Sequence, residues 1–451
     1  MSRIFGTDGV RGVANTDLSP ELAFKIGRAG ATVFSRSSDR HQPIIAGRDT
    51  RLSGTMLEAA MVAGITSVGR DVITIGIVPT PCVATVTVRT QAAAGVMISA
   101  SHNPIADNGI KFFGPDGFKL SDAIEMDIEA LLDSNDLPRP TGVDVGVAKL
   151  AQNLAAKYYD ALYEHAADLS GLTVVVDAAF GAAYAIAPYV LKKLGATVHE
   201  LHCEADGSRI NVRSGATDLE PVTTRVRELI AGGDQHVIGI AFDGDADRAM
   251  FVDETGTALS GDHIMFVLAT ALRKLGELPG DALVGTVMSN IGLQRALETY
   301  GIRLLRAPVG DRYVLEQMRG GGFVLGGEQS GHIIDLRRNT TGDGPMTAVT
   351  LLSTLVRTGT KLAELAKEMH VYPQVLVNIR TANKRVLDDP AIIENITQTE
   401  QLLGTGGRLL VRPSGTEPLI RVMIEGEDKV QIDALAHDLA AKIERAAAAQ
   451  V

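Results

Sequence analysis

The sequence has little of what marks secreted, zinc-binding or membrane proteins. Its two cysteines, Cys82 and Cys203, can build neither a disulfide framework nor a zinc site, which favours a reducing compartment. No apolar run approaches the roughly 18 residues that span a bilayer, and the first residues lack the apolar core of a signal peptide. We therefore expect a soluble, cytoplasmic protein that does not associate with membranes.

Basic residues are outnumbered, with 43 Lys and Arg against 54 Asp and Glu and a formal net charge of -11. Non-specific nucleic-acid binding needs a basic surface, so no nucleic-acid partner is expected, although local arginine clusters can still bind anions. The sequence also lacks the Gly-x-x-x-x-Gly-Lys-Ser/Thr loop of nucleotide hydrolases and the Gly-x-Ser-x-Gly elbow of α/β-hydrolases. Both of these enzyme classes are therefore disfavoured.

A pattern of short apolar strands alternating with helical segments occurs three times in the 451 residues. At roughly 100–200 residues per domain, this length corresponds to three or four domains. The third strand of each repeat ends in a polar, glycine-containing or Ser/Asn/Pro-rich loop; these loops are residues 99–104, 243–248 and 326–332. Alternating strands and helices predict βαβ units, whose ligands bind beyond the carboxyl ends of the strands. Three such loops are expected to meet at one cleft.

The last part of the chain has a different pattern and predicts a smaller α+β domain. Its expected strands and helix are residues 374–379, 408–411, 419–424 and 432–447. The predicted fold is therefore α/β, with three similar βαβ-type domains plus this C-terminal α+β domain around one central cleft. The predicted domains are residues 1–152, 153–256, 257–371 and 372–451.

The second of these loops carries three aspartates at alternate positions, Asp243, Asp245 and Asp247, followed by Arg248. Alternate residues of an extended turn point the same way, so the three carboxylates are expected to converge. Without a cation they would repel one another, and oxygen-rich clusters favour Mg²⁺ or Ca²⁺. Two alternatives stay open: a solvated acidic turn, and an EF-hand, although Arg248 stands where that loop needs glycine.

Ser101 and His102 lie in the loop that ends the third strand of the first repeat, within Ser-Ala-Ser-His-Asn-Pro. A serine beside a histidine at a strand end is a candidate nucleophile. Serine, asparagine and proline are also turn residues, so the motif alone leaves both interpretations open. Lys111 follows closely enough to supply positive charge, or it is a surface lysine.

Two further loops suit a sugar phosphate. Glu328 and Ser330 are expected to hydrogen-bond adjacent sugar hydroxyls, and His332 is a candidate for proton transfer because its pKa lies near neutrality. Near the C-terminus, the turn Pro-Ser-Gly-Thr-Glu-Pro after Arg412 offers N–H groups and hydroxyls to an anion, and Arg421 adds charge. In isolation, such a histidine is more often a structural residue, and the turn can also be a polar hairpin.

Taken in order, these four loops resemble those of the α-D-phosphohexomutase superfamily. The superfamily has a serine loop, an Asp-x-Asp-x-Asp metal loop, a Gly-Glu-x-Ser-Gly-His sugar loop and an Arg-x-Ser-Gly-Thr phosphate loop. The resemblance covers essentially the whole chain. It implies four domains around one cleft and a serine that carries a phosphoryl group, which falls on Ser101 rather than Ser99.

Finer details are similar to the members of that superfamily that act on glucosamine phosphates. They are Phe-Gly-Thr-Asp-Gly-Val-Arg-Gly at residues 5–12, the Ser-Ala-Ser-His-Asn-Pro form of the serine loop, and Gln329. The resemblance implies conversion of glucosamine 6-phosphate to glucosamine 1-phosphate through a phosphoserine and a glucosamine 1,6-bisphosphate intermediate. This reaction would feed UDP-N-acetylglucosamine and cell-wall precursor synthesis.

Two alternatives remain beside this activity. One is the same chemistry on glucose or mannose phosphates, and the other is a non-catalytic sugar-phosphate binding protein. The expected partner is a small hexosamine phosphate, and the expected assembly is a monomer or homodimer.

The resemblance also implies a role for individual residues. One Mg²⁺ per chain would be held by Ser101, Asp243, Asp245 and Asp247. The implied catalytic residues are Ser101, Lys111, His332, Arg11 and His102. The implied substrate-binding residues are Arg248, Gly310, Asp311, Glu328, Ser330, Arg412, Ser414, Gly415, Thr416 and Arg421. Outside the four loops, the sequence departs from the superfamily pattern at Phe180 and Asp218.

Overall fold

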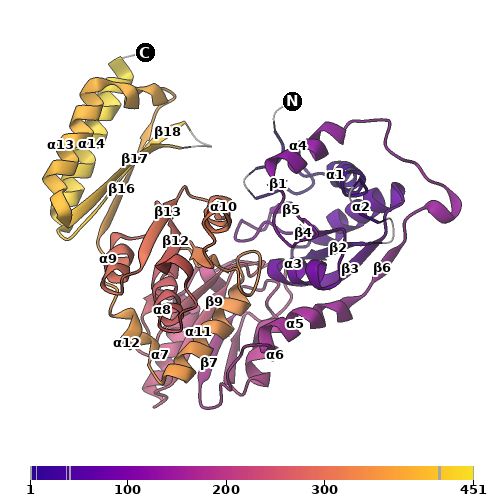
Figure 1. Cartoon of the computed structure of the whole chain (residues 1–451), viewed down its shortest axis with the longest axis horizontal. Helices are drawn as coiled ribbons and strands as arrows, with labels where there is room; N and C mark the ends of the chain where they lie inside the picture. The colour runs from indigo at the N-terminus through magenta and orange to yellow at the C-terminus, as the bar shows by residue number, and fades with distance from the viewer. Residues whose placement is uncertain (1–2, 7, 37, 40–41, 415–417, 450–451) are drawn as a thin grey trace. The chain divides into compact units, whose positions relative to one another are not determined.

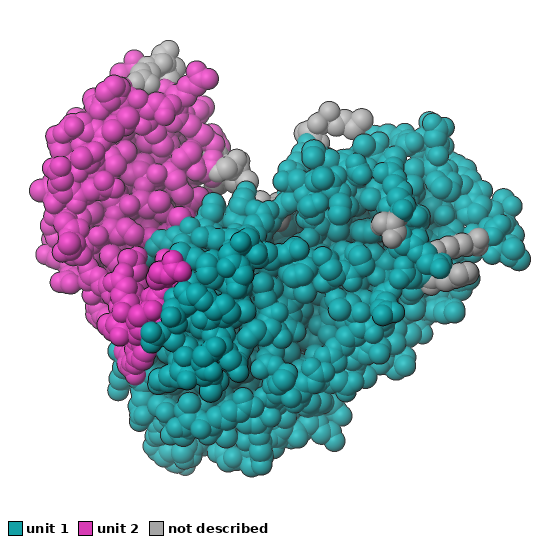
Figure 2. Space-filling view, viewed as in Figure 1, with its two compact units in different colours: residues 1–286, 305–367 teal, residues 287–304, 368–451 magenta. Residues whose placement is uncertain are grey.

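The structure of the protein is a computed structural model (Figure 1). It describes all residues except 1–2, 7, 37, 40–41, 415–417 and 450–451. The chain forms two compact units, residues 1–286 with 305–367 and residues 287–304 with 368–451 (Figure 2). Within the described part of the chain, every helix is too short or too polar to cross a bilayer.

The first domain is built on a six-stranded mixed sheet with the strand order β1-β5-β4-β2-β3-β6. Its strands are β1 (Val10–Val13), β2 (Ile44–Arg48), β3 (Val72–Ile77), β4 (Ala94–Ile98), β5 (Asp107–Phe113) and β6 (Ala148–Leu150). Its helices are α1 (Pro20–Phe34), α2 (Gly54–Ser67), α3 (Thr80–Arg89) and α4 (Asp122–Leu131). Every residue of β4 is buried, as expected for a strand covered on both faces. This strand ends directly before the serine loop.

The second domain has a five-stranded sheet with the order β11-β10-β9-β7-β8. Its elements are α5 (Ala156–Tyr163), β7 (Thr173–Asp177), α6 (Ile186–Lys193), β8 (Thr197–Leu201), α7 (Glu220–Ala231), β9 (Val237–Phe242), β10 (Ala249–Val252) and β11 (Ala258–Leu259). Strand β9 is buried throughout and pairs with β10 in antiparallel register. The carboxylate loop is therefore the connection between two paired strands, which excludes the EF-hand interpretation because that motif is flanked by helices.

The third domain has a four-stranded sheet with the order β13-β12-β14-β15. Its elements are α8 (Gly261–Lys274), β12 (Ala282–Thr286), α9 (Ile291–Thr299), β13 (Arg303–Ala307), α10 (Asp311–Gly321), β14 (Leu325–Gly327), β15 (Ile333–Asp335), α11 (Gly344–Thr358) and α12 (Leu362–Ala366). Helix α8 starts with a capping box, in which His263 Nδ1 accepts the Ser260 main-chain N–H at 3.2 Å and the Ser260 side chain accepts the His263 main-chain N–H. The sugar loop connects β14 to β15.

One hydrophobic core fixes the first and third domains to each other within the first unit. Met97 and Phe113 from the first sheet pack in the same cluster as Tyr158 of α5 and Met346 of α11. The Tyr158 hydroxyl donates to Asp343 Oδ1 at 2.5 Å, and Asp343 caps the N-terminus of α11. The serine, carboxylate and sugar loops therefore belong to one continuous body.

The C-terminal domain lies in the second unit and consists of a three-stranded antiparallel sheet, order β16-β18-β17, with two helices. Its elements are β16 (Gln374–Arg380), α13 (Pro390–Leu403), β17 (Gly407–Pro413), β18 (Leu419–Gly426) and α14 (Lys429–Ala449). The predicted fold class, three α/β domains and a smaller α+β domain, is confirmed. The four predicted domain boundaries stay predictions.

Candidate active site

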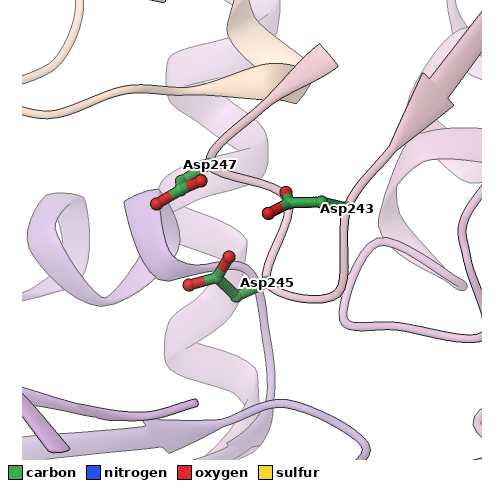
Figure 3. A group of neighbouring side chains, drawn as sticks. All are labelled: Asp243, Asp245 and Asp247. Carbon is green, nitrogen blue, oxygen red and sulfur yellow. The ribbon is translucent and has the colours of Figure 1, made fainter. Parts of the chain in front are cut away.

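Three carboxylates converge on the loop between β9 and β10 (Figure 3). Asp243, Asp245 and Asp247 are buried, and one oxygen of each lies within 4.8 Å of the others. The sequence reasoning expected an extended turn, but Ala246 has a left-handed φ of 55° and its N–H donates to the Asp243 carbonyl at 3.0 Å. A tight turn, rather than strand alternation, therefore brings the carboxylates together.

The chemistry of this cluster fits a divalent cation. Oδ1 of Asp245 and Oδ1 of Asp247 are buried and accept no hydrogen bond from the described residues. Burial, with the charges of Asp247 and Asp245, raises the pKa of Asp243 to about 8. Buried oxygen ligands that repel one another are the environment that Mg²⁺ or Ca²⁺ stabilises.

Ser101 lies against this carboxylate loop. Its hydroxyl donates to Asp243 Oδ2 at 2.7 Å and lies 3.3 Å from His102 Nδ1. Ser99, the rejected alternative, instead donates to Asp49 Oδ2 at 2.5 Å and accepts a bond from the Ser101 N–H. The structure therefore places the hydroxyl of Ser101, and not that of Ser99, at the carboxylate cluster.

Lys111, in the middle of β5, is a buried ammonium group surrounded by carboxylates. Its Nζ lies 3.0 Å from Asp245 Oδ2, 3.0 Å from Asp8 Oδ2 and 3.6 Å from Asp247 Oδ2. Burial alone would lower the pKa of Lys111, but the charges of these carboxylates outweigh it and raise the pKa. The surface-lysine interpretation is wrong, and Lys111 holds its proton firmly in this arrangement.

His332 joins the carboxylate loop to the third domain. Its Nδ1 lies 3.5 Å from Asp247 Oδ1, and its Nε2 lies 3.6 Å from Asp311 Oδ2 at the start of α10. Burial lowers the pKa of His332, but the charges of Asp247 and Asp311 raise it by more than burial lowers it, so the net shift of the pKa is upward. Lys119 pairs with Asp311 and with Asp8, so opposite charges alternate from Asp247 through His332 to the first domain.

Two arginines and a histidine line the same site. Arg11 pairs with Asp8 and donates to Asn103 Oδ1 at 3.3 Å. The N–H of Arg248 donates to Asp243 Oδ1 at 3.2 Å. Burial, followed by the charges of Arg248 and Arg11, lowers the pKa of His102 to about 4, so its imidazole is neutral at pH 7.

The sugar loop is tied to the start of α10. The N–H of Gly310 donates to Glu328 Oε1 at 3.1 Å, and Gly310 has a φ of 126° that only glycine adopts easily. Ser330 Oγ is buried and bonds to none of the described residues. The structure thus brings Gly310 and Glu328 together and leaves the Ser330 hydroxyl available.

The phosphate loop lies in the second unit. Arg412 of β17 stands directly opposite Arg421 of β18, and burial with the Arg421 charge lowers the pKa of Arg412. Like charges on opposite strands destabilise a sheet, which is the arrangement expected where an anion binds. Lys384 adds a third cation because its Nζ donates to the carbonyl of Ser414, which is buried. Gly415 and Thr416 lie outside the described residues.

Sequence reasoning did not select several residues that shape the site. Asp8 lies in the motif at residues 5–12 but was not predicted to be a site residue, and neither were Lys119 and Thr80. The Thr80 hydroxyl donates to Asp245 Oδ2 at 2.6 Å, and its N–H donates to the Asp245 carbonyl at 2.9 Å. No local pattern signals the contacts of Asp8 with Lys111, of Lys119 with Asp311 or of Thr80 with Asp245, because each pair is more than a hundred residues apart in the chain.

The fold and the site define the class of protein as a phosphohexomutase. The defining features are three α/β domains, the order of the four loops, and a buried carboxylate cluster with a serine beside it. Models of the phosphoglucomutase/phosphomannomutase family match the chain at residues 2–139 (domain I), 156–256 (domain II), 260–372 (domain III) and 376–442 (C-terminal domain). The chain belongs to this family.

Curated relatives resemble the chain over its whole length. A protein of Alkaliphilus oremlandii named phosphoglucosamine mutase is 50% identical over 451 residues, with 99% of each chain covered. One of Moorella thermoacetica with the same name is 51% identical over 437 residues, with 96% of this chain and 97% of the relative covered. Among solved structures, a phosphoglucomutase/phosphomannomutase family protein of Burkholderia thailandensis shares the fold with a TM-score of 0.83, at 24% identity, and 99% and 98% of the two chains are covered.

Proposed function

We propose that the protein interconverts glucosamine 6-phosphate and glucosamine 1-phosphate, with Ser101 as the carrier of the transferred phosphoryl group. The observation that carries the proposal is the Ser101 hydroxyl, 2.7 Å from Asp243 within a buried carboxylate cluster. The full-length similarity to proteins named phosphoglucosamine mutase supports the substrate. Phosphorylated Ser101 gives its phosphoryl group to O1 of glucosamine 6-phosphate, and the resulting glucosamine 1,6-bisphosphate reorients before it returns its 6-phosphoryl group to Ser101.

The residues that would hold one Mg²⁺ are Asp243, Asp245 and Asp247, together with a phosphoryl oxygen on Ser101. The bound ion supplies positive charge at the transferring group. Thr80 holds Asp245 in this loop through both its hydroxyl and its N–H.

Positive side chains surround the phosphoryl group on the remaining sides. Arg11, Arg248 and Lys111 are expected to bind its oxygens and to stabilise the charge that spreads over them. His102 is neutral and close to Ser101 Oγ, so it orients the oxygen without adding charge. These residues lower the barrier by electrostatic stabilisation that is present before the substrate arrives.

Proton transfer to and from the sugar hydroxyl is assigned to Lys111 and His332. Because carboxylates raise the pKa of Lys111, its ammonium group stays protonated and is a weak acid, so it suits hydrogen bonding to the sugar hydroxyl better than abstraction of the hydroxyl proton. His332, whose pKa is raised from a value near neutrality, suits exchange in both directions. The two groups therefore have different roles in the two halves of the cycle.

The sugar and its non-reacting phosphate bind to the two remaining loops. Glu328 and Ser330 bind adjacent hydroxyls, and Gly310 and Asp311 form the neighbouring part of the sugar site. The non-reacting phosphate is assigned to Arg412, Ser414, Gly415, Thr416 and Arg421. The buried Ser330 hydroxyl, which bonds to none of the described residues, and the facing arginines of β17 and β18 support these assignments.

A coupled assay with purified protein, Mg²⁺ and a trace of hexose 1,6-bisphosphate tests the proposal. Glucosamine 6-phosphate is expected to be turned over with a higher kcat/KM than glucose 6-phosphate or mannose 6-phosphate. Ser101→Ala is expected to be inactive, whereas Ser99→Ala keeps the Ser101 hydroxyl and retains reduced but measurable activity, because the Ser99 hydroxyl bonds to Asp49 and only supports the Ser101 N–H. The substrate assignment fails if glucosamine 6-phosphate is the poorest of the three, and the mutase assignment fails if none is converted.

A further inference from the structure

The backbone of the serine loop is held by a buried ion pair outside the assigned site. Arg51 and Asp49 follow β2, their side chains are fully buried, and Arg51 Nε lies 3.0 Å from Asp49 Oδ2. We propose that this pair positions Ser101 for phosphoryl transfer by fixing both the main-chain N–H and the main-chain carbonyl of Ser101. The proposal rests on the function proposed above.

Arg51 uses its whole guanidinium group to hold the serine loop. A guanidinium has five N–H donors, and five acceptors lie within hydrogen-bond distance of Arg51. Besides Asp49, they are the main-chain carbonyl oxygens of Ser101 (2.9 Å), Asn103 (2.7 Å), Pro104 (2.5 Å) and Asp107 (3.0 Å). One side chain therefore sets the path of the loop from the nucleophile to the start of β5.

Asp49 holds the main-chain N–H of Ser101 through the Ser99 side chain. Its Oδ2 accepts a bond from the Ser99 hydroxyl at 2.5 Å, and Ser99 Oγ accepts the N–H of Ser101 at 2.9 Å. The N–H of Ser101 is thus linked to Asp49 through Ser99, while its carbonyl is bonded directly to Arg51. Both peptide groups that flank the Ser101 side chain are fixed by the pair.

Ser101 needs this support because its backbone conformation is unfavourable. Its φ is 53°, in the left-handed region that costs a residue with a Cβ about 1 kcal/mol or more. From the second domain, Asn211 Nδ2 donates to the same carbonyl at 2.9 Å. If the loop relaxed to a common φ, the hydroxyl would turn away from Asp243.

Arg51 is a positioning residue that does not contact the substrate. The Arg51 side chain is fully buried, and all five of its N–H donors are used by Asp49 and four main-chain carbonyls, so no donor is left for a sugar phosphate and its effect on the reaction must pass through Ser101. A lysine ammonium has three N–H donors on a single nitrogen and cannot bond to all four carbonyl oxygens as the planar guanidinium does. Arg51→Lys keeps the charge opposite Asp49 but releases the loop.

Arg70 provides a matched control. It is also a buried arginine of the first domain, and its guanidinium donates to the carbonyls of Asp39 and Gln42 and to Ser35 Oγ. None of these partners belongs to the serine loop. Arg70→Lys should therefore cost stability in the same domain without moving Ser101.

The experiment compares kcat, KM for glucosamine 6-phosphate and the melting temperature of wild type, Arg51→Lys, Arg70→Lys and Asp49→Asn. Displacing a reacting group by about 1 Å costs roughly 100-fold in rate. We expect kcat of Arg51→Lys to fall by that order with KM within about twofold of wild type, whereas Arg70→Lys keeps its kcat. Asp49→Asn, which retains a side chain of the same shape, should lose roughly tenfold by the same displacement argument.

The outcomes separate this proposal from the proposed function. If wild type does not convert any hexose phosphate, the function fails and this inference fails with it. If wild type is active but Arg51→Lys and Arg70→Lys lose kcat equally at equal loss of melting temperature, the positioning role is refuted while the function stands. If Arg51→Lys does not fold, Asp49→Asn decides, and an unchanged kcat in Asp49→Asn overturns the proposal.

Discussion

The carboxylate cluster predicts that divalent-cation binding depends on pH in a defined direction. In the folded protein without a cation, burial and two neighbouring carboxylates raise the pKa of Asp243 to about 8. The cation needs this carboxylate ionised, so below pH 8 it must displace a proton. The observed Mg²⁺ affinity should therefore fall as the pH is lowered, by roughly 50-fold between pH 8 and pH 6, or about 2 kcal/mol at 1.4 kcal/mol per tenfold.

The stability of the cation-free protein should change in the opposite direction. A carboxyl group whose pKa is higher in the folded than in the unfolded state binds its proton more tightly when folded. The cation-free protein therefore loses stability as the pH rises from about 4, the unfolded value, towards the raised value for Asp243. The rise in melting temperature caused by Mg²⁺ should be larger at pH 8 than at pH 6.

Calorimetric titration of the dephosphorylated protein with Mg²⁺ at pH 6, 7 and 8, in two buffers of different ionisation enthalpy, measures both affinity and proton release. We expect close to one proton released at pH 6 and fewer at pH 8. In Asp243→Asn, binding should be weaker and should lose most of its pH dependence. Equal affinity at pH 6 and pH 8 with no proton released would refute the reasoning about Asp243.

Three substitutions test other parts of the structure. Gly342→Ala puts a Cβ 2.3 Å from Cε1 and Nε2 of His332, so the buried ring must move and kcat should fall roughly 10- to 100-fold. Ser330→Ala removes a hydroxyl that bonds to none of the described residues, so KM should rise several-fold while unfolding free energy changes by less than about 0.5 kcal/mol. Arg408→Met removes the guanidinium 2.8 Å from the buried Glu425 carboxylate, so denaturant unfolding should show a loss of about 3 kcal/mol.

Matched substitutions distinguish these effects from general damage. Gly320→Ala in α10 adds a Cβ with nothing within 4 Å, so it should leave kcat and stability near wild type. Arg445→Met, at an exposed position of α14, should leave stability unchanged. A kcat of Gly342→Ala equal to wild type would show that the position of His332 is unimportant. A stability loss in Ser330→Ala as large as that in Arg408→Met would show that the serine is structural.

The apolar strands could be predicted because their periodicity is a local property of the sequence. The expected strand at residues 374–379 coincides with β16 except for its last residue, and the expected helix at residues 432–447 lies within α14. Strand β5 was not identified, because Asp107, Asn108 and Gly109 precede its apolar part and are typical of a turn. Pairing with β1 and β4 on either side overrides that local preference.

In the site, too, the residues within short motifs could be predicted from the sequence, whereas the contacts between distant segments could not. Ser101 and the three aspartates lie in short motifs, so their presence together could be inferred from the order of loops. The contact of Lys111 with Asp8 joins β5 to the N-terminal segment, and the contact of Lys119 with Asp311 joins the first domain to the third. Such pairs depend on how the domains pack, which no short stretch of sequence specifies.

The central claim is that Ser101 carries the phosphoryl group, and intact-mass measurement tests it most directly. Wild-type protein and Ser99→Ala, incubated with a hexose 1,6-bisphosphate and Mg²⁺, should each gain the mass of one phosphoryl group, and peptide fragmentation should locate it on Ser101. Ser101→Ala should gain none. Wild-type protein that remains unphosphorylated, or Ser101→Ala that gains the same mass, would contradict the account.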